Sequence, residues 1–355
     1  MFAAPRGRPS EMAALWGLVA SFAGLTIAAT LFSGLRFVHA GPFFTTFGGL
    51  FAALLALNLY QRARMPENQR TIFFVDMVAL YMVIAIMMAI YQYALATFNA
   101  RPISGLIEHA DHAIGFHWIA YAAFVGRLTP LSEAMKFCYL NWTDGFLVAM
   151  LAMTYLREYD ELYEFSFAYA IGGMAMLSVS AVFDSRSYEA VATYGLVGFH
   201  HPVGVGPETM EKLQALRSGM DRTLDFSRVL GLIAFPSLHA GSALLVAVAT
   251  RNLRWLWLPF LVFNELILVG VISEGGHNFM DLIGGCAFAI AGLAAARALR
   301  RALGRESGSA AVRAPGQTLP HLLRPPGDAA NLPFEIEAKP LATEPHRRDS
   351  SGWLA

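Results

Sequence analysis

The sequence predicts an all-α fold, a polytopic transmembrane helical bundle. Three observations predict it: 56% of the 355 residues are apolar, only 15% are charged, and the apolar residues fall into long uninterrupted runs. A bilayer core requires about 20 apolar residues for each helical crossing. Soluble domains rarely have this composition. We expect about eight spans, with six or seven as the alternatives.

The expected spans are joined by mostly short polar connections. They lie near residues 13–35, 41–60, 71–95, 134–156, 165–183, 229–250, 255–272 and 279–298. The first run has no small-residue cleavage site after it, so we expect a retained span and not a signal peptide. The fourth has the weakest pattern, because Lys136, Asn141 and Asp144 interrupt its apolar residues.

Basic residues predict the orientation of the bundle. Short cytoplasmic connections are rich in Lys and Arg, and every second connection here is basic. These connections and the first residues contain Arg6, Arg8, Arg62, Arg64, Arg70, Arg157, Arg251, Arg254, Arg297, Arg300 and Arg301. We therefore expect both termini to be cytoplasmic. In a bacterium the protein would lie in the inner membrane, with the opposite face toward the periplasm.

Two stretches carry polar chemistry inside apolar sequence: Phe235-Pro-Ser-Leu-His239 and Gly275-Gly-His277-Asn-Phe-Met-Asp281. On a helix, His277 and Asp281 would share one face, so the carboxylate could hold one imidazole nitrogen and leave the other available. Two apolar runs joined by a basic turn separate the stretches, so the chain crosses and returns. We expect both histidines at the outer face.

These stretches suggest a phosphate site. Pro236 can open a helix, and Ser237 then lies among backbone N–H groups that suit a phosphate oxygen. Gly276 leaves room for a headgroup to approach the backbone. One histidine can attack phosphorus while the other protonates the leaving oxygen. The sequence thus predicts His239, His277 and Asp281 as catalytic, and Ser237 and Gly276 as phosphate-binding.

The motifs resemble those of the type 2 phosphatidic acid phosphatase superfamily. Its second motif reads Pro-Ser-Gly-His, and its third reads Ser-Arg, five residues, His, three residues, Asp. The third-motif Ser-Arg pair falls on Gly270 and Val271 here, and the first motif, Lys, six residues, Arg-Pro, is not found. With Leu238 inside the second motif, the pattern resembles the branch of inositol phosphorylceramide synthase.

The resemblance implies an integral membrane enzyme with a phospholipid donor and a lipid or water acceptor. Its leading form is an inositolphosphotransferase-like enzyme that works through a phosphohistidine and needs no metal or cofactor. The alternatives are a lipid or polyprenyl phosphate phosphatase and a non-enzymatic membrane protein or degenerate relative. The implied organisation is N-terminal transmembrane helices over 1–183, a catalytic core over 184–301, and a disordered cytoplasmic tail over 302–355.

Arginines between residues 184 and 228 are the expected stabilisers of a phosphoryl group in transfer. Guanidinium groups can bind two phosphate oxygens at once, and the third-motif arginine is missing here. We predict that Arg217 takes this role, with Arg222 as the second choice. The alternative is that each is an ordinary solvated charge.

Other polar features favour less specific interpretations. Residues 99–130 contain His109, His112 and His117 and could hold a metal, but their spacing favours an interfacial helical segment. Haem ligation or structural roles for the central histidines are further alternatives. The formal net charge of zero gives no support for nucleic-acid binding. We expect Cys138 and Cys286 to be free thiols.

Overall fold

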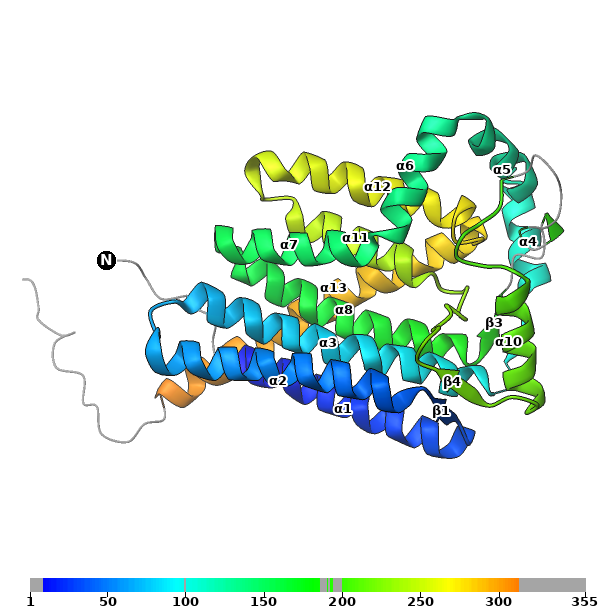
Figure 1. The fold of residues 1–355 in the computed structure, drawn as a ribbon. Helices are drawn as coiled ribbons and strands as arrows, with labels where there is room; N and C mark the ends of the chain where they lie inside the picture. Colours follow the sequence, from blue (N-terminus) through cyan, green and yellow to red (C-terminus); the bar gives the residue numbers. More distant parts are fainter. Residues whose placement is uncertain (1–8, 99, 186–189, 191, 194–199, 313–355) are drawn as a thin grey trace, which may run out of the picture. The chain divides into compact units, whose positions relative to one another are not determined.

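The computed structural model describes residues 9–98, 100–185, 190, 192–193 and 200–312, and it confirms the predicted all-α bundle (Figure 1). Within these residues, six helices are long and apolar enough to cross a membrane. They are α1 (Pro9–Ser33), α2 (Ala40–Arg64), α3 (Gln69–Ala96), α8 (Tyr159–Ser180), α12 (Trp257–Ser273) and α13 (Phe279–Val312). Two shorter apolar helices, α7 (Trp142–Leu156) and α11 (Leu238–Thr250), lie within the fourth and sixth expected spans, so the number of long spans among the described residues is six and not the preferred eight.

The remaining elements are short. The helices among them are α4 (Ser104–Ala113), α5 (Trp118–Arg127), α6 (Thr129–Leu140), α10 (Pro207–Ser218) and the 3-10 turn η1 (Arg254–Leu256). The strands are β1 (Arg36–Val38), β2 (Arg101–Pro102), β3 (Phe183–Asp184) and β4 (Thr223–Asp225). β1 pairs in parallel with β4, and β2 with β3. Each pair joins the end of a long helix to a distant loop.

Helices α3 and α8 form the interior of the bundle. Helices α1 and α2 pack on α3, and α8 packs against both α3 and α11. The side chains of Met77, Leu80, Phe165 and Phe167 are fully buried there. Helix α2 buries only Asn58, so its apolar side chains face outward, as expected of a helix in contact with lipid.

The expected fourth span is not one helix. It divides at Asn141 into α6 and α7, which point in different directions (Figure 1). The Asn141 side chain donates to the carbonyl of Phe137 at 2.8 Å, so a local side chain satisfies an acceptor at the end of α6. The interrupted apolar pattern therefore marks a real break between two helices.

The expected sixth span begins too early. Residues 226–236 are not helical, and α11 starts at Leu238. Helix α3 supplies the hydrogen bonds that a helix would have made: the N–H groups of Leu230 and Leu232 donate to the Tyr93 hydroxyl at 2.9 Å and to Gln92 Oε1 at 3.3 Å. Backbone groups in apolar surroundings are costly without such partners.

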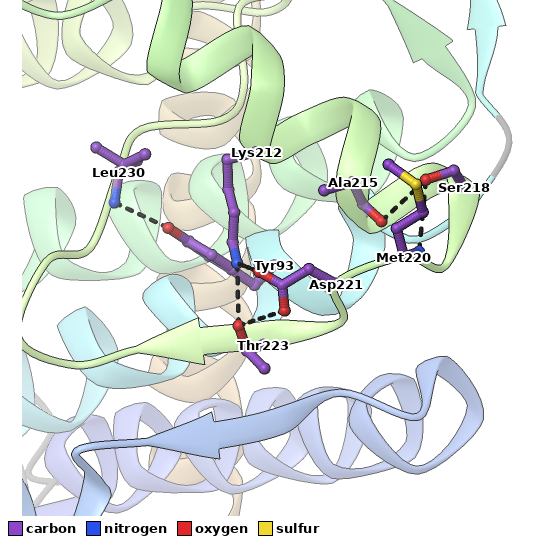
Figure 2. A network of polar contacts seen from close by, with 8 residues as sticks. All are labelled: Tyr93, Lys212, Ala215, Ser218, Met220, Asp221, Thr223 and Leu230. Carbon is purple, nitrogen blue, oxygen red and sulfur yellow. Dashed lines mark hydrogen bonds and ion pairs between the residues drawn. The ribbon is translucent and has the colours of Figure 1, made fainter.

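The segment before this extended chain is held by its own polar network (Figure 2). Lys212 Nζ on α10 donates to Asp221 Oδ2 at 2.7 Å and to Thr223 Oγ1 at 3.1 Å. The Thr223 hydroxyl donates to Asp221 Oδ1 at 2.6 Å. The network anchors β4 to α10. Farther along the chain, the Tyr93 hydroxyl holds Leu230 before α11 begins.

The structure divides into two compact units, residues 1–309 and 310–355. The first holds the bundle. Of the second, the described part is the end of α13 to Val312, and residues 313–355, most of the predicted tail, lie outside the described residues. The predicted interfacial segment contains α4 and α5, which lie at the same end of the bundle as α10 (Figure 1). Its position at a membrane surface stays a prediction.

We expect Tyr93→Phe to destabilise the bundle. The substitution leaves the half-buried N–H of Leu230 without its partner, which costs about 1 kcal/mol. Thermal unfolding in detergent measures the loss. Tyr60→Phe on α2 is the matched control, because Tyr60 is 53% exposed whereas Tyr93 is 1% exposed. Equal unfolding temperatures for the two variants would show that the hydroxyl of Tyr93 is not needed.

Candidate active site

The two predicted histidines line one cavity. It encloses about 460 Å³, including the space at its open mouth, and its walls include His239, His277, Gly275, Gly276 and Tyr139. The apolar side chains of Val205, Met210 and Ile233 complete much of the lining. The structure therefore brings together both halves of the predicted site, although 38 positions separate the histidines in the chain.

His239 lies in the first turn of α11, and Ser237 caps that helix. The Ser237 hydroxyl accepts from the N–H of Ala240 at 3.4 Å, and the backbone N–H of Ser237 donates to the Asp281 carbonyl at 3.0 Å. Pro236 therefore precedes the cap and does not open the helix as expected. Gly285 allows the close approach of α13, because a Cβ there would lie 2.2 Å from the Ser237 carbonyl oxygen.

His277 differs in one respect from the expected geometry. It lies two residues before α13, not on that helix. Its Nδ1 nevertheless lies 3.6 Å from Asp281 Oδ2, a distance typical of an ion pair and long for a hydrogen bond. Asp281 Oδ2 also accepts from the N–H of Asn278 at 2.9 Å. The carboxylate thus holds both the turn and the imidazole.

The other imidazole nitrogen of His277 faces Ser237. Its Nε2 lies 3.4 Å from the Ser237 hydroxyl oxygen. Ser237 and Asp281 are completely buried, and His277 is 5% exposed. Since Nδ1 faces the carboxylate, Nε2 is the nitrogen available for chemistry.

Asp111 on α4 positions this half of the site. Its two carboxylate oxygens accept from the N–H groups of Phe279 at 2.9 Å and Met280 at 3.0 Å. Burial raises the pKa of Asp111, while the two backbone hydrogen bonds oppose this shift. A carboxylate in this position satisfies the first N–H groups of α13 and favours its macrodipole. Sequence reasoning considered the segment around Asp111 for metal binding and missed this role.

The histidine-rich segment does not form a metal site in the part of the chain that the structure describes, where no three ligand side chains converge. The rings of His112 and His117 lie 4.5 Å apart, but Asp111 beside them is directed to α13. The segment instead packs on the elements that carry His277.

The two predicted arginines lie outside the histidine cavity. Arg217 Nη1 pairs with Asp184 Oδ2 at 2.6 Å in a neighbouring cavity, which shares Ile233 and Ala234 with the first. Arg222 is farther along, where its Nη1 donates to the Ser33 carbonyl at the end of α1 at 2.8 Å. Arg222 thus satisfies a helix C-terminus, which differs from the expected phosphate contact.

Gly276 shapes the wall of the cavity. Its φ of +63° is a left-handed conformation, and a Cβ there would lie 2.0 Å from Val205 Cγ1. Both the backbone conformation and the lack of space require glycine at this position. Gly276 therefore brings the chain around from α12 to His277, in addition to its predicted role beside a headgroup.

Sequence reasoning also missed three side chains near the histidines. The ring of Tyr139 stacks on His239, and Trp142 meets the same imidazole edge-on. Glu274 is fully buried at the end of α12, with Oε1 at 2.9 Å from His200 Nε2. A glutamate directly before Gly275 was the available signal for Glu274. The aromatic residues gave none, because aromatic side chains are common throughout this sequence.

The comparison with protein families identifies the class of protein. Residues 106–295, more than half of the chain, match a family model described as PAP2 superfamily. The chain belongs to this superfamily. Membership supports phosphatase or phosphotransferase chemistry on a lipid substrate, and the apolar helices support an integral membrane protein. Searches of curated proteins and of solved structures gave no match.

We expect Gly276→Ala to disrupt the site. The substitution forces a Cβ into Val205 and strains the backbone, at a cost of about 1–3 kcal/mol. Thermal unfolding and any catalytic activity should both fall. Gly48→Ala is the matched control, since Gly48 lies in α2 with open space around it and should be neutral or slightly stabilising. Equal effects from the two substitutions would contradict this account of Gly276.

Proposed function

We propose that the protein is a membrane lipid phosphotransferase of the inositolphosphotransferase type. The observation that carries the proposal is that His239 and His277 line one cavity while Asp281 lies behind His277. A nucleophile, its orienting carboxylate and a second histidine in the same cavity are the parts that a double displacement at phosphorus requires.

In the first step, His277 Nε2 attacks the phosphorus of a lipid phosphodiester or monoester. A nitrogen–phosphorus bond forms as the bond to the leaving oxygen breaks, and His239 donates its proton to that oxygen. The product is a phosphohistidine. Asp281 orients the ring and stabilises the positive charge that develops on it.

In the second step, the neutral His239 accepts a proton from the hydroxyl of the acceptor. The acceptor oxygen attacks phosphorus, the nitrogen–phosphorus bond breaks, and both histidines return to their starting states. A lipid hydroxyl as acceptor gives headgroup transfer, whereas water gives a phosphatase. The two reactions use the same residues, so the acceptor alone distinguishes them.

Charge on the phosphoryl oxygens needs donors around the cavity. The distance of 3.4 Å between the Ser237 hydroxyl and His277 Nε2 supports the proposed role of Ser237 as one of them. Arg217 remains the proposed arginine because its Nε is buried without a hydrogen-bond partner in the adjoining cavity. Arg222 stays the second choice, although its Nη1 donates to the Ser33 carbonyl.

The transferase assignment rests on the Pro236-Ser237-Leu238-His239 sequence. The apolar side chains of Val205, Met210 and Ile233 in the cavity wall suit a lipid substrate. We further propose that the site opens at the outer face of a bacterial inner membrane. The α2–α3 connection, with basic residues on both sides, lies at one end of the bundle, and α4, α5 and α10 lie at the other (Figure 1). The basic end is then cytoplasmic.

We expect His277→Ala to abolish turnover without unfolding the protein. Removal of the attacking nitrogen should reduce activity by at least about a thousandfold. Activity in liposomes and thermal unfolding in detergent are the two measurements. His109→Ala is the matched control, since His109 is exposed on α4 and should keep full activity. Substantial turnover by His277→Ala would end the phosphohistidine proposal.

The products should identify the acceptor. Purified protein in liposomes receives phosphatidylinositol or phosphatidic acid as donor, with ceramide or diacylglycerol as acceptor. We expect the phospho-headgroup to appear on the acceptor lipid and to vanish with His277→Ala. Release of inorganic phosphate or of a soluble headgroup phosphate would establish a phosphatase instead. No product from any of these donors would support a protein without this activity.

A further inference from the structure

Two aromatic rings hold His239 from neighbouring helices. The ring of Tyr139, near the end of α6, stacks on the imidazole with centroids 4.7 Å apart and planes inclined by 25°. The ring of Trp142, the first residue of α7, meets it edge-on at 5.0 Å and 68°. The break at Asn141 lies between the two rings, so both sides of the break contact one imidazole.

These contacts are what orients His239. His277 has Asp281 and Ser237 as polar neighbours, whereas within the described residues no side-chain hydrogen bond fixes the imidazole of His239. Tyr139 is itself held firmly, since it is 7% exposed and its hydroxyl oxygen lies against Gly204 and Gly275. A rigid ring therefore supports the histidine that the proposed mechanism uses as the acid.

The geometry points to Tyr139 and Trp142 as positioning residues that orient His239, and to the stacked face of Tyr139 as the contact that stabilises its protonated form. This inference rests on the proposed function. An imidazolium in a half-buried, largely apolar position is disfavoured by lost hydration. The face of an aromatic ring attracts a cation and offsets part of that cost. The contact thus lowers the cost of placing a proton on His239 before it meets the leaving oxygen.

Few other titratable groups face His239. Among the described residues they are Tyr139 itself on α6 and His277 on the turn before α13, and the charge of Glu274 acts on Tyr139. A positive charge on His277 would oppose protonation of His239. The aromatic contacts are therefore the stabilising contribution that can be removed without changing any charge.

Tryptophan fluorescence tests the inference without catalysis. A protonated imidazole in contact with an indole quenches its emission, so the pH titration of Trp142 reports the protonation of His239. The chain has six tryptophans, and subtraction of the same protein carrying Trp142→Phe isolates this one. His239→Gln should remove the titration and thereby assign it.

We expect Tyr139→Leu to lower the titration midpoint by about one pH unit, because the protonated form loses its aromatic support. Tyr139→Phe keeps the ring and should keep the midpoint. Phe137→Leu, on the same helix but 61% exposed, controls for general damage to α6. An unchanged midpoint in Tyr139→Leu, or a titration that survives His239→Gln, would overturn the inference.

The pH dependence of turnover then links the contact to catalysis. Loss of the imidazolium ends leaving-group protonation, so the alkaline limb of kcat should move to lower pH in Tyr139→Leu by the same amount as the fluorescence midpoint. Equal limbs in the two proteins would overturn the catalytic part of the inference. A fluorescence shift in a protein that turns over no lipid would refute the proposed function alone.

Discussion

Backbone N–H and C=O groups inside an apolar bundle must form hydrogen bonds with partners other than water. Several of the hydrogen bonds that satisfy them lie in the candidate site. At the start of α13, the Asp111 carboxylate accepts from two N–H groups, and the Asp281 carboxylate accepts from Asn278. At the start of α11, the N–H of Ser237 donates to the Asp281 carbonyl. These hydrogen bonds at the starts of α11 and α13 also hold the segments that bring His239 and His277 to one cavity.

Much of this arrangement follows from the sequence, because it depends on local pattern and chain direction. Apolar runs long enough to cross a bilayer predicted the bundle. Two such runs between His239 and His277 predicted that the histidines return to the same end. The interval of four residues from His277 to Asp281 predicted their proximity. The expectation that both lie on one helix is wrong, since α13 begins only at Phe279. The short interval was sufficient by itself.

The sequence could not show the features that depend on partners far away in the chain. Residues 229–235 are apolar enough for a membrane helix, yet they are not helical. Tyr93 and Gln92 on α3 accept hydrogen bonds from the N–H groups of Leu230 and Leu232. Asp111 lies in a segment that looks like a metal site until α13 is placed beside it. The hydrogen bond from Arg222 to the Ser33 carbonyl at the end of α1 also joins distant parts of the chain.

The bond between α4 and α13 has a consequence for biogenesis. Asp111 leaves the ribosome well before Phe279 and Met280, and its carboxylate has no helix start to accept from until α13 arrives. Because α13 is the final long helix of the described chain, insertion of the earlier helices cannot complete the site. Assembly of the candidate site is therefore a late event, which waits for α13 to bring Phe279 and Met280 to Asp111.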